Sequence, residues 1–295
     1  MPAKIAISMG DPGGIGPEVA VLALADPRVR SEVQPVLFGD RATLERAARL
    51  RGVSLSAPVV QTGSSPLAAL EGAMRAVAAG EHAALCTAPL SKERVAAELP
   101  GFVGHTEHLA SFTGRRVAMM MAGPRLRVVL ATNHLALADV PRKLTAEQLS
   151  FVCALAHSEL RSRFGIQRPR IAVCGLNPHA SDGGLFGDEE ARIVTPGIVK
   201  ARAAGADVDG PFAADALFAR RGYDAIVALY HDQGLIPAKL LDFRETVNVT
   251  LGLPWPRTSP DHGTADDIAW KGLADPEPMI SALLLAARLG SAARE

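Results

Sequence analysis

Short runs of β-branched and apolar residues alternate along the chain with longer segments rich in alanine and leucine. This alternation is typical of an α/β fold, in which helices join buried strands. The first expected helix begins at Pro17, where the missing N–H has no helical partner. The expected strands cover residues 4–8, 35–38, 83–87, 127–132, 170–175 and 225–230, and the expected helices cover 17–25, 40–51, 66–79, 145–163, 188–204 and 276–289.

One break in the hydrophobic pattern predicts a hairpin. The apolar segment 117–132 is divided by Gly123 and Pro124, a pair that is typical of turns. Strands joined by so short a turn run antiparallel. The sheet is therefore expected to be mixed rather than purely parallel.

The composition restricts the class of partner. The chain has 295 residues, of which 48% are hydrophobic, so one large or two moderate domains with a substantial core are expected. Its 31 basic and 31 acidic residues cancel and form no run of one sign. Proteins that bind nucleic acid or a membrane surface usually need a net positive face, so neither partner is expected and small polar ligands remain.

Neither a targeting segment nor a membrane helix is expected. The apolar stretch before Gly10 is too short for a signal peptide, and no window approaches the roughly 18 apolar residues of a membrane helix. The cysteines Cys86, Cys153 and Cys174 are odd in number, widely separated and without a C-x-x-C pair. This spacing indicates neither a disulfide framework nor a sulfur metal site, so a reducing cytoplasm is the expected location.

Three histidines stand in equivalent positions relative to the expected strands. His134, His179 and His231 each lie at or just beyond the carboxyl end of an expected strand. In open α/β sheets these ends line the ligand crevice, so the three imidazoles can converge on a divalent metal with open coordination positions. The alternative is that each is a polar loop residue bonded to backbone. Imidazole ligands suit Zn, Co, Ni and Fe, and open positions also admit Mg with substrate oxygens.

A glycine-rich turn precedes the first expected helix. Residues 10–18, "GDPGGIGPE", could bind an anion at the helix N-terminus. The segment matches neither the dinucleotide fingerprint nor the P-loop, so a tight turn that merely needs glycine is the favoured interpretation.

Further polar residues are candidates for ligand contacts. His105 and Thr106 stand at an expected helix start, where Thr106 has an alternative role as a cap. Lys239, Asn248 and Arg257 follow one another at intervals of nine residues. A spaced lysine and arginine are usually surface charge, but near a metal they become candidates for binding phosphate or carboxylate.

Several of these segments together carry a resemblance to a known family. In this order, "GDPGGIGPE", "GHTE", "TNHLALADV", "GLNPHASDGG", "YHDQG" and "LPWPRTSPDHGTA" resemble the 4-hydroxythreonine-4-phosphate dehydrogenase family of vitamin B6 biosynthesis. The segment 262–276 also resembles the cofactor loop of isopropylmalate and isocitrate dehydrogenases. The resemblance implies two α/β/α domains with mixed sheets of that fold. Residues 1–95 with 258–295 would form the terminal domain and 96–257 the central domain, with the active site in the cleft between them.

The resemblance also implies roles for particular residues and for partners. His134, His179 and His231 would bind a divalent metal (Zn, Mg or Co) at a site that two subunits of a homodimer share. The remaining implied roles are substrate binding by His105, Thr106, Lys239, Asn248 and Arg257, binding of NAD or NADP by His262, Gly263, Thr264 and Asp267, and catalysis by Asp215 and Lys239.

The implied reaction fits these residue types. A dication among neutral imidazoles keeps its charge and lowers the pKa of a substrate hydroxyl, which favours oxidation by a nicotinamide. For 4-phosphooxy-L-threonine the product is a 3-oxo acid, which decarboxylates to 3-amino-2-oxopropyl phosphate.

Departures from the family pattern keep other substrates open. Gly13 stands where alanine is usual, Ser181 and Asp182 replace "GE", "TNHLAL" replaces "TTHLPL", and Trp270 is bulky for its place. Some of these features resemble a sister branch that oxidises four-carbon phosphorylated sugar acids (4-phospho-erythronate or 4-phospho-threonate) or dihydrodiol carboxylates. A metal-dependent hydrolase or lyase and a non-catalytic metal-binding protein are more distant alternatives.

Overall fold

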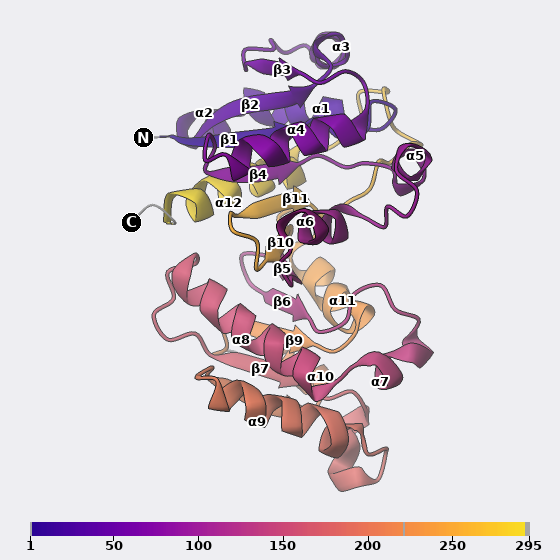
Figure 1. Ribbon diagram of the computed structural model, residues 1–295, viewed down its shortest axis with the longest axis vertical. Helices are drawn as coiled ribbons and strands as arrows, with labels where there is room; N and C mark the ends of the chain where they lie inside the picture. Colours follow the sequence, from indigo (N-terminus) through magenta and orange to yellow (C-terminus); the bar gives the residue numbers. More distant parts are fainter. Residues whose placement is uncertain (1, 221, 293–295) are drawn as a thin grey trace. The chain divides into compact units, whose positions relative to one another are not determined.

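The strands and helices expected from the hydrophobic pattern are largely present in the computed structural model, which describes residues 2–220 and 222–292. The chain divides into two compact units. The first, here the terminal unit, comprises Met1–Val117 and Val247–Glu295, and the second, the central unit, comprises Ala118–Thr246. In Figure 1 the terminal unit carries the indigo-to-purple and the yellow ends of the colour scale.

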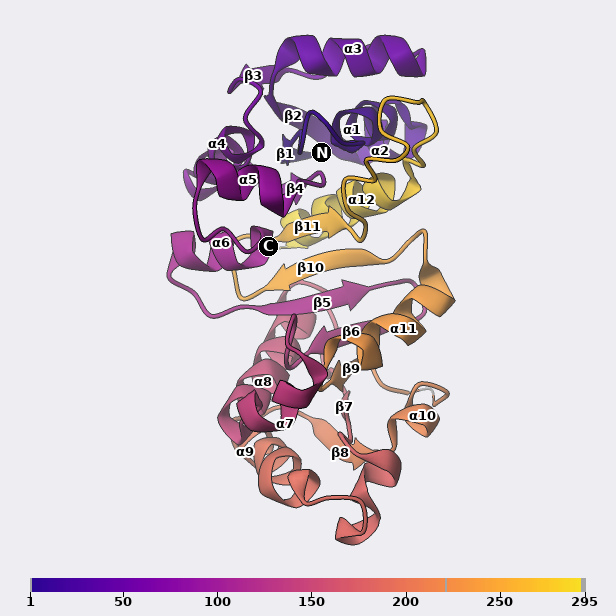
Figure 2. The same ribbon diagram turned by 90° about the vertical axis from the view of Figure 1, so that its right-hand side faces the viewer.

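The terminal unit is a sheet with helices on both faces. Its strands lie in the order β3-β2-β1-β4-β11-β10, and all neighbours whose pairing is described run parallel except β10 and β11. Figure 2 shows α4 on one face of this sheet and α1 and α12 on the other. Its elements are β1 (Ala3–Ser8), α1 (Gly16–Ala25), α2 (Pro27–Glu32), β2 (Val33–Gly39), α3 (Arg41–Arg51), β3 (Val59–Gln61), α4 (Pro66–Ala78), β4 (Ala84–Thr87), α5 (Lys92–Glu98), α6 (His105–Thr113), β10 (Val247–Leu251), β11 (Arg257–Pro260) and α12 (Glu277–Ala292).

The central unit repeats this architecture. Its strands lie in the order β5-β6-β9-β7-β8, with β5 antiparallel to β6 and the others parallel. Helices α8 and α9 cover one face, and α10 and α11 the other (Figure 2). Its elements are β5 (Ala118–Ala122), β6 (Arg127–Leu130), a 3-10 turn (Leu137–Asp139), α7 (Val140–Lys143), α8 (Ala146–Ser162), β7 (Ile171–Cys174), a turn segment (Pro178–Gly184), a π turn (Glu190–Val194), α9 (Thr195–Ala203), β8 (Val208–Phe212), α10 (Ala214–Leu217), β9 (Ala225–Ala228) and α11 (His231–Asp242).

The central strands are apolar because both of their faces are covered. Every residue of β4, β5, β7 and β9 is buried. Strands covered on both faces read as continuous hydrophobic runs rather than alternating ones. The predicted hairpin is confirmed, since β5 and β6 pair antiparallel around Gly123 and Pro124.

Helix starts follow ordinary capping chemistry. The carboxylate of Asp40 accepts from the backbone N–H of Thr43 at 2.9 Å, and the Thr145 hydroxyl accepts from Gln148 N–H at 3.1 Å. Each bond satisfies a donor that has no partner within the first turn. These caps set the starts of α3 and α8 within one residue of the expected positions.

The helices differ from the expectation at two places. The helix expected over 188–204 is divided into the π turn Glu190–Val194 and the helix α9, with Pro196 in the first turn of α9. Proline has no N–H and cannot continue a ladder of hydrogen bonds from the preceding turn. Helix α11 was not expected at all, since Gly234 and Pro237 both lie inside it and both disfavour a helix interior.

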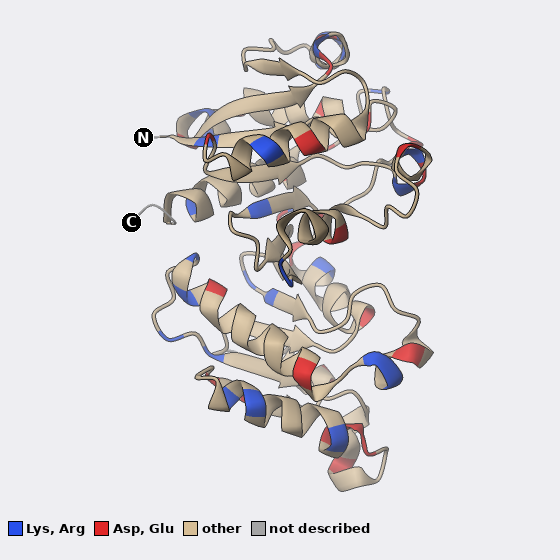
Figure 3. Cartoon of the chain, in the orientation of Figure 1, with Lys and Arg blue, Asp and Glu red and all other residues tan. Residues whose placement is uncertain are grey.

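Charge is mixed over both units. Figure 3 shows basic and acidic segments interspersed within each unit, in keeping with the balanced composition. Within residues 2–220 and 222–292, every helix is too short or too polar to cross a bilayer.

Candidate functional site

The three histidines follow three neighbouring parallel strands of the central unit. Strands β6, β9 and β7 lie side by side in that order and point the same way. His134 follows the end of β6, His231 begins α11 after β9, and His179 follows β7. All three therefore start from the carboxyl edge of one sheet, which is where ligands bind in open α/β folds.

Two of these histidines are side by side. The ring centroids of His134 and His231 are 5.5 Å apart, and the rings are inclined by 41°. Two imidazoles bound to one ion at Zn–N distances near 2.0–2.1 Å would place their centroids roughly 5 Å apart. Both line a cavity of about 280 Å³ together with Asn133 and Tyr230. The spacing of the pair therefore fits a shared metal ion.

A carboxylate orients one of the two rings. The Nδ1 atom of His231 lies 2.7 Å from Oδ1 of Asp232. In the neutral imidazole this arrangement places the proton on Nδ1, so Nε2 carries the lone pair that a metal needs. Carboxylate partners of this kind are usual behind metal-binding histidines.

Gln233 and Thr132 hold the strand ends together. The amide of Gln233 accepts from Leu229 N–H at 2.7 Å and donates to the carbonyl of Gly175 at 2.7 Å. The buried Thr132 hydroxyl donates to the Leu229 carbonyl at 2.7 Å. These bonds join the ends of β6, β9 and β7. Neither residue was predicted from the sequence to have a role, although Gln233 lies in the motif "YHDQG".

His179 does not join the pair within this chain. It lies in a turn in which residues 179–182 all have positive φ, and its ring contacts Phe186 at a centroid distance of 6.3 Å. The buried Glu190 shapes this turn by accepting from Leu176 N–H at 2.7 Å and Asn177 N–H at 2.8 Å. In the part of the chain that the structure describes, no three histidine, cysteine or acidic side chains are grouped to hold a metal.

Arg257 is a buried cation of the terminal unit. The residue is 2% exposed, and its guanidinium donates to the hydroxyls of Thr87 at 2.6 Å and Thr250 at 3.2 Å. Nε has no hydrogen-bond partner, and within the described residues no carboxylate forms an ion pair with this side chain. Burial lowers the pKa of Arg257 to about 10. The charge of Glu107 opposes this shift without forming an ion pair. A buried cation with no carboxylate in direct contact is costly, which suits a residue that receives an anionic ligand.

Other expected substrate contacts of this unit also have buried polar atoms, although His105 and Asn248 are half-buried as whole residues. Burial, followed by the charge of Arg257, lowers the pKa of His105 well below its ordinary value, so this imidazole is neutral. His105 Nε2 and Asn248 Oδ1 have no hydrogen-bond partner, and Thr106 is 6% exposed. Polar atoms buried without partners are rare in folded proteins and suit residues that bind a ligand.

Lys239 and Asp215 belong to the central unit. Lys239 is half-buried on α11, eight residues after His231, so their backbones are roughly 12 Å apart along the helix. Asp215 is exposed in the short helix α10. These positions do not establish a catalytic role for either side chain, and both roles stay predictions.

The expected cofactor residues lie in an irregular loop of the terminal unit. His262 Nδ1 is 3.0 Å from the carbonyl of Gly263, and Thr264 is half-buried. Gly263 and Asp267 are exposed, and a Cβ at Gly263 would meet no atom within 4 Å. An open backbone and an exposed carboxylate fit a nucleotide, because carboxylates accept hydrogen bonds from ribose hydroxyls.

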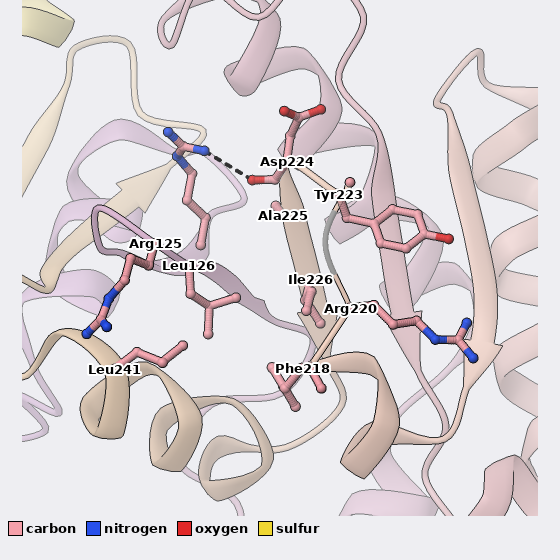
Figure 4. A pocket seen from close by; sticks show the side chains of 12 residues that line it. Arg125, Leu126, Phe218, Arg220, Tyr223, Asp224, Ala225, Ile226 and Leu241 are labelled. Atoms are coloured by element: carbon pink, nitrogen blue, oxygen red, sulfur yellow. Dashed lines mark hydrogen bonds between the residues drawn. The ribbon is translucent and has the colours of Figure 1, made fainter.

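A larger cavity of about 480 Å³ lies elsewhere in the central unit. It is lined by residues at the starts of β6 and β9, which is the opposite end of these strands from the histidines. Figure 4 shows Arg125 and Arg220 pointing away from the apolar Leu126, Phe218 and Ile226. Its charged groups do not converge, so we do not assign the site to this cavity.

Comparison with known proteins identifies the family. The model of the family described as pyridoxal phosphate biosynthetic protein PdxA matches residues 29–286. The chain belongs to the PdxA family. A 4-hydroxythreonine-4-phosphate dehydrogenase of Geobacter metallireducens is 43% identical over 97% of this chain and 95% of its own length. A D-threonate 4-phosphate dehydrogenase of Cupriavidus necator is 42% identical, with 97% of both chains covered. The predicted membership of this dehydrogenase family is confirmed.

Solved structures confirm the predicted fold class. The 4-hydroxythreonine-4-phosphate dehydrogenase of Klebsiella pneumoniae has a TM-score of 0.86 at 38% identity and covers 98% of each chain. A terephthalate 1,2-cis-dihydrodiol dehydrogenase of Burkholderia xenovorans has a TM-score of 0.69 at 32% identity, again over 98% of each. A β-decarboxylating dehydrogenase of Thermococcus kodakarensis has a TM-score of 0.51 at 16% identity and covers 97% of this chain and 81% of its own, which is a likeness of fold alone.

Proposed function

We propose that this PdxA-family chain catalyses the NAD(P)-linked, divalent-metal-dependent oxidation of 4-phosphooxy-L-threonine. The C3–H bond and the hydroxyl O–H bond break, and a 3-oxo acid forms. The C1–C2 bond of that acid then breaks to release carbon dioxide, and C2 takes up a proton to give 3-amino-2-oxopropyl phosphate. The nicotinamide, when bound, accepts the hydride from C3.

The observation that carries the proposal is the His134–His231 pair with its Asp232 partner. The 5.5 Å spacing and the bond from Nδ1 to Asp232 suit two Nε2 ligands on one dication. Such an ion, when bound, would stabilise negative charge on the substrate oxygen. Imidazole donors fit zinc or cobalt, and magnesium fits if substrate oxygens complete its shell.

The chain's own groups would position the substrate. We propose that Arg257 binds an anionic group of the substrate, because its buried guanidinium has an unused Nε–H. His105 is neutral and Asn248 has an unpartnered Oδ1, so both can bond a hydroxyl or an ammonium group. Lys239 would carry the second positive charge, and Asp215 or Lys239 would move the proton.

A kinetic panel tests the substrate. We expect NADH or NADPH formation at 340 nm with 4-phosphooxy-threonine, and a much slower reaction with free 4-hydroxythreonine. A metal-dependent hydrolase or lyase would convert substrate without any change at 340 nm, so product analysis in the absence of nicotinamide separates that class. A protein whose melting temperature responds to neither cofactor nor substrate would instead be a non-catalytic metal-binding protein.

A second candidate substrate is a four-carbon phosphorylated sugar acid. It is favoured by the 42% identity to the D-threonate 4-phosphate dehydrogenase of Cupriavidus necator. 4-Phospho-threonate and 4-phospho-erythronate belong in the same panel, together with a dihydrodiol carboxylate. Turnover of a sugar acid without turnover of the amino acid would replace the first proposal.

We further propose that the chain acts as a homodimer in the cytoplasm and that two copies share each metal site. The cysteines are buried thiols, which suits a reducing compartment. Within one chain His179 is not grouped with the pair. Large apolar side chains stand exposed on α11 at Ile236 (59%) and Leu240 (81%), and at Leu185 (72%), directly after the turn segment that contains His179. Exposed apolar side chains of this size suit a surface that a second copy covers.

Mixing inactive variants tests the shared site. A His179→Ala subunit and a His231→Ala subunit together retain one complete site per mixed dimer, so about a quarter of wild-type activity should return after random re-pairing. His134→Ala with His231→Ala is the matched control, because these two residues are neighbours in one chain. Equal recovery in both mixtures, or none in either, would contradict the proposed sharing.

A further inference from the structure

The loop that carries the expected cofactor residues is attached to the glycine-rich turn of the same unit. The backbone N–H of Ile15 donates to the carbonyl of Thr264 at 3.0 Å. A Cβ at Gly14 would lie 2.8 Å from the Cβ of Thr264, so glycine is needed for this contact. The turn over residues 10–18 therefore supports the loop, in keeping with its interpretation as a tight turn.

Arg94 of α5 joins the two segments a second time. Its Nε donates to Asp11 at 2.6 Å, and its Nη2 donates to both oxygens of Asp266 at 2.9 and 3.1 Å. The Asp11 side chain is 2% exposed and also accepts from Gly13 N–H at 2.8 Å. A Cβ at Gly13 would lie only 3.2 Å from Nη1 of Arg94. Glycine at position 13 thus leaves room for this arginine.

Trp270 makes the third attachment. Its backbone N–H donates to the fully buried Glu18 at 2.6 Å, and its indole N–H donates to the carbonyl of Pro12 at 2.9 Å. The guanidinium of Arg46 stacks on the indole ring at 4.1 Å from its centroid. Trp270 has φ of 60°, a left-handed conformation that is unfavourable for a residue other than glycine and persists only when contacts hold it.

We propose that Arg94 and Trp270 are positioning residues that hold the loop 262–270 ready to bind the dinucleotide. The inference rests on the proposed function, which assigns the cofactor to His262, Gly263, Thr264 and Asp267. The loop contains neither helix nor strand, so its shape depends on contacts with the turn and with α5. A loop that is ordered before binding loses less conformational entropy when the ligand arrives.

The positioning role predicts that the binding of the cofactor is weakened while kcat and the KM for the phosphorylated substrate are nearly unchanged. Arg94→Ala should weaken NADH or NADPH binding and raise the KM for the oxidised cofactor by about tenfold, because the loop must then be ordered by the ligand. The kcat and the KM for the phosphorylated substrate should change by less than about twofold, since neither residue is assigned to the reacting groups. Arg94→Lys keeps the positive charge but loses the planar fork that reaches Asp11 and Asp266 from two different nitrogens, so it should be intermediate.

The experiment compares direct titration of NADH and NADPH into the wild-type protein, Arg94→Ala, Arg94→Lys and Arg75→Ala. Arg75 is the matched control, because it is an arginine of the same unit in an exposed ion pair with Glu71. Trypsin cleavage after the exposed Lys271, without cofactor, is a second readout and should be faster in Arg94→Ala than in either the wild type or Arg75→Ala.

The outcomes separate this inference from the proposed function. If the wild-type protein binds neither nucleotide, the dehydrogenase proposal fails, and the positioning role fails with it. If the wild type binds one and Arg94→Ala binds it equally well, only the positioning role is overturned. A lower melting temperature of Arg94→Ala with unchanged affinity and unchanged cleavage would likewise show a purely structural role.

Discussion

At the scale of single residues, Arg257 is the clearest case of a side chain whose burial indicates a ligand. Arginine is ordinarily exposed or paired, yet here it is 2% exposed and its guanidinium is bonded only to hydroxyls. Its position in the sequence, nine residues after Asn248, made it a candidate anion-binding residue but gave no sign that it would be buried.

We expect Arg257→Ala to lower kcat/KM for 4-phosphooxy-threonine by more than roughly a hundredfold, about 3 kcal/mol, because charge-assisted hydrogen bonds to a dianion are lost. The same variant should affect free 4-hydroxythreonine much less. Steady-state kinetics with both substrates measure the difference, with Arg75→Ala as a surface control. Equal losses for both substrates would assign Arg257 to the carboxylate rather than to the phosphate.

The buried His82 should make the stability of the protein depend on pH. Burial, and then the charge of Lys4, lowers its pKa below 6.5, and neither ring nitrogen has a hydrogen-bond partner. Above pH 6.5 the folded and unfolded states are both neutral at this residue, so it contributes nothing. Below that pH the unfolded chain takes up the proton first, so stability falls until the pH passes the folded pKa.

His82→Leu should therefore lose less stability than the wild type between pH 7.5 and pH 5.5. Melting temperatures measured across this range provide the test. His105 and His108 also have lowered pKa values, so part of the acid sensitivity should remain in the variant. Parallel curves for the two proteins would show that His82 does not contribute.

At the scale of elements, the approach of α11 to its sheet determines where His231 lies. A Cβ at Gly234 would come within 2.5 Å of Val128 Cγ1 and 2.9 Å of Ala228 Cβ. The helix therefore packs against β6 and β9 at a distance that only glycine allows. His231 begins this helix, so its position relative to His134 depends on the same packing.

Gly234→Ala should lower the free energy of unfolding by about 1–3 kcal/mol, because a methyl group is forced into a close-packed contact. It should also weaken metal binding, since a displaced α11 carries His231 away from His134. Thermal unfolding and metal titration measure the two effects, with Val199→Ala on the exposed face of α9 as the control. Unchanged stability would contradict the close packing at this position.

At the scale of the whole molecule, the exposed apolar residues of α11 are the feature that a single chain leaves unexplained. Leu240 is 81% exposed and Phe243, directly after the helix, is 70% exposed. Side chains of this size gathered at one site suit contact with another copy of the chain.

We expect the double variant Leu240→Glu/Phe243→Glu to sediment as a monomer and to lose most of its turnover, because a shared metal site would be incomplete. Val199→Glu, on another exposed face, should keep the association state of the wild type. Sedimentation velocity and NADH formation are the measurements. A fully active monomer would contradict the proposed sharing of the site.

The sequence by itself determined the local features of this protein. Its periodicity predicted strands such as β1 and helices such as α3 nearly to the residue, and its ordered motifs predicted the family. The sequence also predicted that His134, His179 and His231 each follow a strand, because each histidine lies within a few residues of the strand end. These features depend on interactions between residues that are close in the sequence, so a single sequence is enough to predict them.

Tertiary structure alone decided which distant residues meet. It brought His134 beside His231 but not His179, buried Arg257 against Thr87, and joined Asp11 to Asp266 through Arg94. It also formed α11 despite Gly234 and Pro237, because packing against β6 and β9 outweighs a weak intrinsic helix propensity. Such contacts follow from the order of strands in each sheet and from close packing between elements, and neither is encoded in any one stretch of the chain.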